Sequence, residues 1–300
     1  MDKRKAAFRQ AISCLPPARL AQLERLEGQE NAEELRFRAG RPPSLRTAAG
    51  ETPLPLEAVT AAELRDILSR AAQYSVHSHA DSLRHGFLTL SGGHRLGVCG
   101  TAAEEDGHVL GIRGLSAVNL RIAHQAEGLQ EQIARWVGAD APQSILLLSP
   151  PGYGKTTLLR EWVRYYSDRG FTAAVADERS EIAALADGVP QFAVGRCTDV
   201  MEGCSKLQAA VMLLKTMSPA LLALDEITAP EDAGAVALCT HCGTAVVACA
   251  HAAGTDDLRQ RPLYRELLAL GVFRQAVIIE KQDGKRVYRL ERWEETECSS

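Results

Sequence analysis

The sequence has few aromatic residues and no long apolar runs. Phe, Trp and Tyr make up 5% of its 300 residues, although hydrophobic residues make up 46%. Any core is therefore built mainly from Ala, Leu and Val, and the apolar content argues against global disorder. No run approaches the roughly 18 apolar residues of a membrane-spanning helix, and none follows the charged residues 1–5. We expect no signal peptide and no direct membrane insertion.

The chain also lacks a surplus of basic residues. Its net charge is −4 and its pI is near 6.1. Dedicated nucleic-acid binders usually carry a basic footprint, so nucleic acid is an unlikely partner, although a local basic groove stays open. The eight cysteines have no regular spacing. Cys239 and Cys242 have the spacing of metal ligands, but no second pair accompanies them, and we favour small buried residues over a zinc site.

The pattern of apolar segments changes between the two halves of the chain. The first half mixes short helices with alternating strands such as Glu34–Arg38, and Thr60 is a plausible N-cap of a helix with Glu63 in a capping box. The second half alternates apolar strands with helices, as in a parallel sheet. The predicted fold is α/β: a smaller N-terminal α+β domain with a linker over residues 1–140, and a P-loop NTPase domain with a largely parallel sheet over residues 141–300.

Residues 149–156 read Ser-Pro-Pro-Gly-Tyr-Gly-Lys-Thr between a predicted strand and a predicted helix. Glycines allow backbone N–H groups to surround a phosphate, Lys155 adds positive charge, and the Thr156 hydroxyl can ligate Mg²⁺. Ser149 stands where the usual pattern has Gly, which we expect to strain the loop or weaken nucleotide affinity. The candidate ATP-binding residues here are Pro151, Gly152, Tyr153, Gly154, Lys155, Thr156 and Thr157.

Acidic residues follow two other predicted strands. Asp225 and Glu226 end the apolar run at 220–224, where Asp225 can hold Mg²⁺ and Glu226 can activate the attacking water as a general base. Asp177 and Glu178 end another strand, and the carboxyl ends of parallel strands meet at the ligand crevice. His251 follows a further strand and could contact the γ-phosphate. The predicted catalytic residues are Glu226, Glu178 and His251, with Asp177 among the cofactor-binding residues.

Taken together, these motifs resemble the stage III sporulation protein AA family, relatives of the type II and type IV secretion and pilus motor ATPases. The resemblance rests on residues 34–38, 91–97, 119–123, 149–156, 177–183, 198–200, 203–206, 217–219 and 225–227. It implies a RecA-like fold, a homo-hexameric ring with ATP and Mg²⁺ between subunits, an acidic box at Asp177, Glu178 and Glu181, and a histidine box at His251.

The resemblance also implies a cellular setting and further phosphate contacts. Arginines of the N-terminal domain reach the phosphates in such ATPases, and Arg95, Arg113 and Arg121 are the candidates, because the guanidinium fork matches phosphate oxygens. The family member is expected in the mother-cell cytoplasm, peripheral to the membrane through a partner. It would power or gate a channel complex between mother cell and forespore.

Several positions depart from the family pattern. Ser149 replaces Gly, Cys197 replaces the Arg of Arg-Thr-Asp-Val, Thr228 replaces Gly, and Ala252 follows His251 in place of Gly. We therefore expect slow hydrolysis and keep two alternatives: a nucleotide-gated scaffold with little turnover, and a nucleic-acid-stimulated ATPase. A small-molecule kinase is the least favoured, since Glu226 suits activation of water.

Overall fold

The chain divides into two compact units in a computed structural model that describes residues 2–73, 83, 86–105, 108–124, 128–137, 140–186, 188–282 and 285–293. Unit 1 comprises Met1–His124 and Ala186–Gln191, and unit 2 comprises Gln125–Leu185 and Phe192–Ser300. The division thus lies before the expected boundary at 140. The reason is helix α5 (Leu129–Val137), whose apolar side chains join the core of unit 2.

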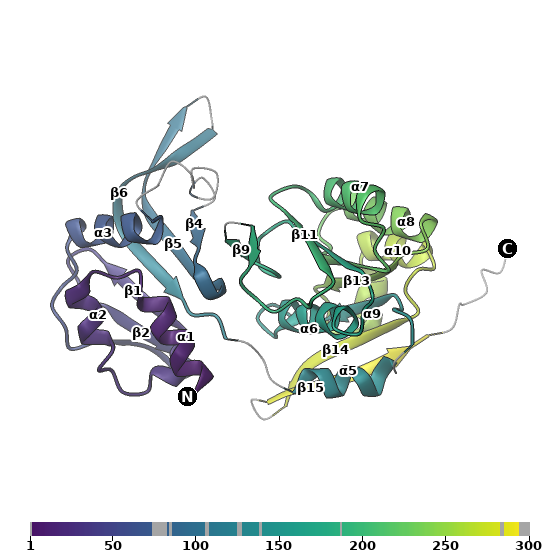
Figure 1. Cartoon of the computed structure of the whole chain (residues 1–300), viewed down its shortest axis with the longest axis horizontal. Helices are drawn as coiled ribbons and strands as arrows, with labels where there is room; N and C mark the ends of the chain where they lie inside the picture. Colours follow the sequence, from purple (N-terminus) through teal and green to yellow (C-terminus); the bar gives the residue numbers. More distant parts are fainter. Residues whose placement is uncertain are drawn as a thin grey trace. The chain divides into compact units, whose positions relative to one another are not determined.

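Unit 1 contains a six-stranded antiparallel sheet, with the strand order β3-β2-β1-β6-β5-β4. One face of the sheet is covered by helices α1 (Lys3–Ile12), α2 (Pro17–Leu23) and α3 (Ala61–Ala71), as Figure 1 shows. Leu35 and Phe37 are buried in this core, whereas the other three residues of β1 (Glu34, Arg36 and Arg38) are partly exposed, as the alternation in the sequence predicts. The strands are β1 (Glu34–Arg38), β2 (Ser44–Thr47), β3 (Gly50–Pro53), β4 (Phe87–Thr89), β5 (Arg95–Glu105) and β6 (His108–Arg121).

The helices of unit 1 begin at identifiable caps. Helix α3 (Ala61–Ala71) starts at the predicted N-cap, where the Thr60 hydroxyl accepts a hydrogen bond from the Glu63 amide at 3.0 Å. The Glu63 carboxylate does not complete the capping box but binds the buried Arg19 of helix α2 (Pro17–Leu23) at 2.7 Å. Helix α1 (Lys3–Ile12) was not expected; Asp2 caps it.

Unit 2 contains a seven-stranded sheet in the order β11-β8-β12-β13-β7-β14-β15. All neighbouring pairs are parallel except the hairpin β14–β15, which confirms the expected largely parallel sheet. The sequence pattern predicts the turn of this final hairpin at Asp283-Gly284, and these two residues lie outside the described ones. The strands are β7 (Ile145–Leu148), β8 (Ala173–Asp177), β11 (Thr198–Glu202), β12 (Leu221–Glu226), β13 (Ala245–Ala250), β14 (Gln275–Gln282) and β15 (Lys285–Arg292).

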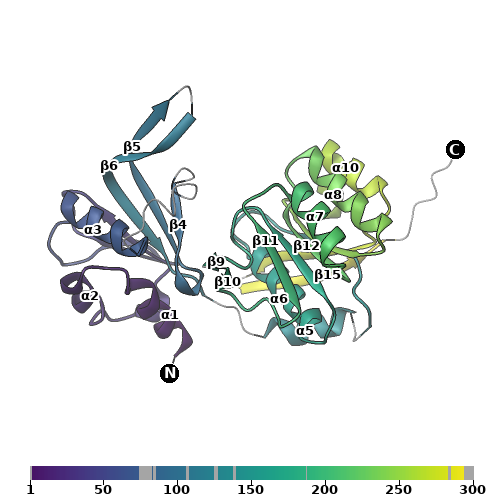
Figure 2. The ribbon, with the colours of Figure 1, turned by 45° about the horizontal axis from the view of Figure 1, so that its top comes forward.

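Both faces of the central strands of this sheet are buried. Leu146 and Leu148 of β7 belong to one apolar cluster, and Ile145 and Leu147 to another on the opposite face. Helices α7, α8 and α10 lie on the first side and α5 and α6 on the second (Figure 2). Continuous apolar runs, and not alternating ones, are what strands buried on two faces require. The helices are α6 (Lys155–Ser167), α7 (Lys206–Thr216), α8 (Pro230–His241), α9 (Thr255–Gln260) and α10 (Pro262–Ala269).

A short hairpin links the two units along the chain. Its strands are β9 (Leu185–Ala186) and β10 (Val189–Pro190), and residues 186–191 belong to unit 1 although the segments before and after belong to unit 2. Within unit 1, the Gly92 amide donates to the Gln191 side-chain oxygen at 2.9 Å. None of the helices in the described part of the chain combines the length and apolar character that crossing a bilayer demands.

Candidate functional site

The predicted phosphate loop joins strand β7 to helix α6. Gly152 and Gly154 have φ of 77° and 95°, values that favour glycine, and Gly154 is the N-cap of the helix. The loop therefore exposes backbone N–H groups at a helix N-terminus, where anions bind. Lys155, only 7% exposed, donates from Nζ to the carbonyl oxygens of Ser149 at 3.0 Å and Pro150 at 3.4 Å. Its ammonium group is thus bonded to the backbone of the loop itself.

Ser149 fits this loop without the expected backbone strain. It is fully buried and, unlike the two glycines, does not have a positive φ. Its hydroxyl donates to the Pro150 carbonyl at 2.8 Å and lies 3.5 Å from Lys155 Nζ. The expectation that a Cβ here strains the loop is therefore wrong. The serine adds a polar neighbour to the lysine.

Strand order brings the other predicted residues toward this loop. Strand β13 lies between β7 and β12, so His251 follows the strand that separates the phosphate loop from Glu226. The register shifts between Leu224 and Glu226, which leaves Asp225 as an extra residue in β12. Parallel strands place their carboxyl ends at one edge of the sheet, and this edge collects Lys155, Asp225, Glu226 and His251.

Glu226 and His251 form a direct pair. The distance from His251 Nδ1 to Glu226 Oε1 is 2.6 Å, and both side chains are partly buried. Burial lowers the pKa of His251, and Lys155 lowers it further, while Glu226 opposes the shift. A neutral imidazole with its proton on Nδ1 can donate to the carboxylate and fix its orientation.

Tyr264 of helix α10 fixes the backbone behind this pair. Its hydroxyl donates to the Ile227 carbonyl at 3.0 Å and accepts from the His251 amide at 3.3 Å. One side chain thereby joins the segments that follow β12 and β13. No sequence pattern singled out Tyr264, because the contact spans 37 residues.

Asp225 is a buried carboxylate in an acidic environment. It is 4% exposed, and burial, together with Glu181 and Asp177, raises its pKa to about 6. Burial lowers the pKa of Lys155, whereas Cys249, Glu226 and Asp225 raise it. A crowded set of carboxylates favours a cation at this position, and carboxylate and hydroxyl oxygens suit Mg²⁺. Asp225 and Thr156 can supply such oxygens.

Asp177 lies at the end of β8 and is fully buried. Its carboxylate accepts hydrogen bonds from four backbone amides, those of Glu181 at 2.8 Å, Ile182 at 3.1 Å, Ala183 at 2.8 Å and Ala184 at 3.4 Å. Ser180 and Ala184 adopt positive φ values of 52° and 51° around this turn. The predicted cofactor contact of Asp177 is not what the structure shows, because its oxygens hold the strained turn of the acidic box together.

Arg160 of helix α6 holds the same turn from the other side. It donates from Nε to the Ile182 carbonyl at 2.6 Å and from Nη2 to the Glu181 carbonyl at 2.8 Å, and its guanidinium stacks 3.6 Å from the Phe192 ring centroid. The phosphate-loop helix and the acidic box are therefore joined by one buried arginine. Sequence reasoning missed this residue, since an arginine on a helix carries no local signal of burial.

Glu178 forms an ion pair with a lysine, whereas Glu226 is paired with a histidine. Glu178 accepts from Nζ of Lys206, a buried residue of α7, at 2.5 Å, and Lys206 also lies 3.5 Å from Asp232. Asp232 in turn accepts from the amides of Thr228 and Ala229. Glu178 thus belongs to an ion-pair network that anchors α7 and α8. Its predicted catalytic role remains a prediction.

The candidate arginines of unit 1 lie on neighbouring strands. Arg95 and Arg121 are directly opposite each other in the β5–β6 pair, and Arg113 lies farther along β6 opposite Thr101. The Arg95 guanidinium stacks 3.5 Å from the Phe87 ring centroid, and Arg121 is 3.7 Å from Glu34. These two arginines share one face of the sheet. Their contact with phosphates remains a prediction.

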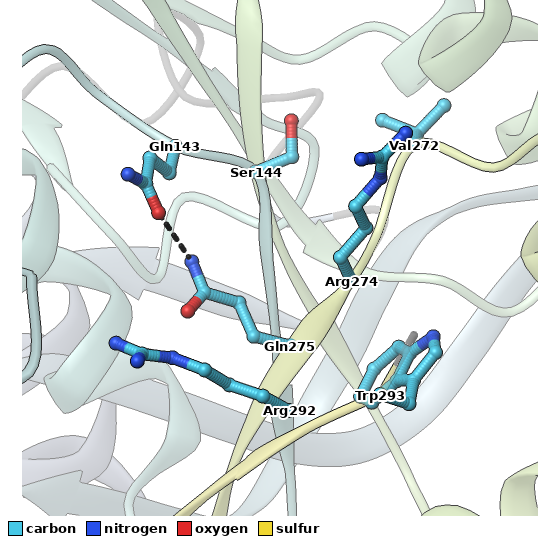
Figure 3. Close-up of a pocket in the computed structure, with 7 residues that line it drawn as sticks. All are labelled: Gln143, Ser144, Val272, Arg274, Gln275, Arg292 and Trp293. Atoms are coloured by element: carbon cyan, nitrogen blue, oxygen red, sulfur yellow. Dashed lines mark hydrogen bonds between the residues drawn. The ribbon is translucent and has the colours of Figure 1, made fainter. Parts of the chain in front are cut away.

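A cavity of about 590 Å³ lies at the amino ends of the strands of the unit 2 sheet, opposite the ends that carry the phosphate loop (Figure 3). Ser144 and Gln275 stand at the amino ends of β7 and β14, whereas the phosphate loop follows the carboxyl end of β7. The Gln143 and Gln275 amides bond to each other at 3.1 Å, and Arg292 donates to the Trp136 carbonyl. The cavity is lined by Gln143, Ser144, Val272, Arg274, Gln275, Arg292 and Trp293.

The cysteine pair with metal-ligand spacing lies at the C-terminal end of α8. Cys239 is buried near the end of α8 and Cys242 is its exposed C-cap. No cluster of three or more His, Cys, Asp or Glu side chains suited to a metal occurs within the described residues.

Comparisons with known proteins agree with this architecture. The family model described as "Sporulation stage III, protein AA" matches residues 6–289. Stage III sporulation protein AA of Bacillus subtilis (strain 168) is 34% identical over 257 residues, which cover 84% of this chain and 83% of that protein. Protein SEEDLING PLASTID DEVELOPMENT 1 of Arabidopsis thaliana is 27% identical over 260 residues, which cover 86% of this chain and 35% of that protein.

Two solved structures share the fold at low sequence identity. The pilus retraction motor PilT with bound ADP superposes with a TM-score of 0.63 at 16% identity, covering 88% of this chain and 80% of PilT. The ATPase DotB of Legionella pneumophila superposes with a TM-score of 0.58 at 17% identity, covering 87% of this chain and 76% of DotB. The chain therefore shares the fold of these two structures.

Proposed function

Since this chain belongs to the sporulation stage III protein AA family, we propose that it is an Mg²⁺-dependent ATPase that serves a secretion-like channel between mother cell and forespore. The observation that carries the proposal is the Glu226–His251 pair at 2.6 Å, at the carboxyl ends of β12 and β13, of which β13 is the neighbour of the phosphate-loop strand β7. A phosphate loop alone binds a nucleotide. A carboxylate oriented beside it can also activate water.

The backbone N–H groups of the loop and the Lys155 side chain would bind the phosphates of the nucleotide. Gly152 and Gly154 hold the turn open in conformations that glycine favours, so its N–H groups can surround phosphate oxygens. The hydrogen bonds of Lys155 to two loop carbonyls can be exchanged for bonds to the β- and γ-phosphates. Pro151, Tyr153 and Thr157 complete the proposed ATP-binding segment.

Thr156 and Asp225 would hold Mg²⁺. The fit rests on the buried Asp225 carboxylate, whose pKa is raised to about 6 by burial and by neighbouring acids, so that a cation relieves its charge. When bound, Mg²⁺ neutralises charge on the phosphate oxygens. The protein's own part is to present one hydroxyl and one carboxylate on neighbouring elements.

Glu226 would act as the general base. Its Oε1 accepts from His251, which leaves the other oxygen to accept a proton from water. As the water oxygen forms its bond to the γ-phosphorus, the bond to ADP breaks and ADP departs with the electron pair. His251 restricts the rotation of Glu226, and Tyr264 holds the backbone of His251.

Phosphate release by the wild type, Lys155→Ala and Glu226→Gln, measured with and without Mg²⁺, tests the proposal. We expect turnover in the wild type, loss of nucleotide binding in Lys155→Ala, and retained binding without turnover in Glu226→Gln. Wild-type protein that binds ATP but releases no phosphate at any Mg²⁺ concentration would contradict the enzymatic role.

That outcome would favour a second candidate, a nucleotide-gated scaffold with little turnover. The observation behind it is the buried Ser149 hydroxyl 3.5 Å from Lys155 Nζ, which offers the lysine a partner within its own loop. If channel function survives Glu226→Gln but not Lys155→Ala, binding and not hydrolysis is what the channel uses.

The assembly we propose is a homo-hexamer in the mother-cell cytoplasm, attached to the membrane through channel proteins. Arg95 and Arg121 would reach phosphates in that ring, because guanidinium groups match phosphate oxygens. Light scattering with and without ATP measures the oligomer. A strict monomer under every nucleotide condition would count against the ring.

A further inference from the structure

The hairpin β14–β15 places two cationic side chains against the phosphate loop. Lys281 and Arg286 are directly opposite each other in the antiparallel register, so both side chains lie on the same face of the hairpin. Lys281 Nζ is 4.6 Å from the centroid of the Tyr153 ring. A Cβ built on Gly154 would lie 3.2 Å from both Cζ and Nε of Arg286. The Arg286 guanidinium thus packs on the loop residue that precedes Lys155.

This placement is electrostatically unfavourable for the protein by itself. Like charges directly opposite on a hairpin destabilise it, and a cation at a helix N-terminus opposes the helix dipole. Lys155 adds a third positive charge at the first residue of α6. Within the described parts of the chain, no carboxylate forms an ion pair with Arg286 or Lys281. An anion is the group that this arrangement suits.

Arg289, on the same strand as Arg286, has acidic partners. It pairs with Glu280 at 3.3 Å and with Glu291, so its charge is compensated on the hairpin itself. It lies three positions after Arg286, an odd number, so the two side chains point to opposite faces of β15. Among the described residues, Arg286 and Lys281, which face the loop, therefore differ from Arg289 in having no acidic partner.

We infer that Arg286 is a phosphate-binding residue of the nucleotide site, contributed by the same chain as Lys155, with Lys281 as its neighbour. The inference rests on the proposed nucleotide binding and assigns a residue that neither the loop motif nor the acidic strand ends contain. The guanidinium packs over Gly154, where no side chain intervenes, and a fork of N–H donors can bind phosphate oxygens from there. The register of the hairpin keeps Lys281 beside it.

The test is calorimetric titration of the full-length chain with Mg²⁺ and ATP, and separately with Mg²⁺ and tripolyphosphate. Arg286→Gln, Arg286→Lys and the matched control Arg289→Gln are compared with the wild type. Arg286→Gln should weaken ATP binding about tenfold or more, as expected for loss of a charge-assisted hydrogen bond, and Arg286→Lys by less. Arg289→Gln removes the same charge from the opposite face and should leave the affinity unchanged.

The two titrants separate a phosphate contact from a contact with the base. An equal loss for ATP and tripolyphosphate supports the inference, and a loss for ATP alone overturns it in favour of the base. Unchanged affinity in a folded Arg286→Gln, with melting and circular dichroism like wild type, also overturns it while leaving the proposed function in place. A wild type that binds neither titrant overturns both.

Discussion

Two neighbouring strands of unit 2 end in the same pair of residues, Asp-Glu, yet the pairs have different surroundings. The carboxylate of Asp177, the last residue of β8, accepts hydrogen bonds from four backbone amides, and Glu178 is paired with Lys206. Asp225, near the end of β12, has a pKa raised to about 6, and Glu226 is paired with a histidine. The first pair organises a turn. The second keeps an uncompensated acid and an oriented base, which is what chemistry on a phosphate needs.

The glutamates give the largest expected difference. Glu226→Gln should lower the ATP turnover number about 10²- to 10⁴-fold with little change in ATP affinity, because it removes only the general base. Glu178→Gln keeps a hydrogen-bond acceptor for Lys206 and only weakens one ion pair. We therefore expect the ATP turnover number to fall less than tenfold. Steady-state phosphate release measures both. Equal losses of turnover in the two variants would contradict the difference between the two acid pairs and would support the predicted catalytic role of Glu178.

Asp177→Asn tests the structural half of the comparison. The amide has one acceptor oxygen and places an NH₂ group against backbone donors, so we expect the free energy of unfolding to fall by about 3 kcal/mol. Urea unfolding followed by tryptophan fluorescence reports on unit 2, because Trp136, Trp162 and Trp293 all lie there. The exposed Asp199 offers the same chemical change as a control, with an expected effect near zero. An Asp177→Asn variant as stable as the wild type would show that the charge of the Asp177 carboxylate does not contribute to the stability of this turn.

Asp225→Asn should have the opposite sign. A carboxylate whose pKa rises from 3.8 to about 6 on folding stabilises the protein below pH 4, and that contribution is lost as the pH rises through 6. Without Mg²⁺, the variant should match the wild type near pH 4 and exceed its free energy of unfolding by about 3 kcal/mol at pH 8. Denaturant titrations at the two pH values check this. Destabilisation at pH 8 would show that Asp225 is held by partners, as Asp177 is.

Ser149→Gly sets the smallest expected effect. Ser149 has no positive φ, so a glycine there relieves no strain and adds backbone freedom to the unfolded chain. The affinity for ATP should change by less than about threefold, since the lysine keeps its two carbonyl partners. Turnover and ATP titrations of the two proteins decide the point. A turnover number that rises tenfold or more would make the Ser149 hydroxyl a brake on Lys155.

The sequence predicted the elements whose signals are local. The loop at 149–156, the apolar strand before Asp225 and the Thr60 cap are each contained in fewer than a dozen consecutive residues, and the structure has each of them in place. The largely parallel sheet followed from alternating apolar segments. Strands β2 and β3 were missed because they are short and largely polar.

What the sequence could not show are contacts between distant segments. Arg160 reaches the acidic box 22 residues away, Lys206 reaches Glu178 across 28, and Tyr264 reaches Ile227 across 37. Nothing in the local pattern tells a buried arginine from an exposed one, or one Asp-Glu pair from another. The distinction between the two acid pairs exists only once the turn, the histidine and the helices are in place.

Residues 186–191 have a consequence for dissecting the molecule. Because this segment of the second half of the chain belongs to unit 1, a single cut between His124 and Gln125 does not produce two complete units. The fragment 1–124 would lack the segment that supplies the acceptor for the Gly92 amide, and the fragment 125–300 would carry a hairpin without its partners. Limited proteolysis at that boundary should therefore leave the fragments associated until the hairpin is cut as well, and neither piece is a natural unit for separate expression.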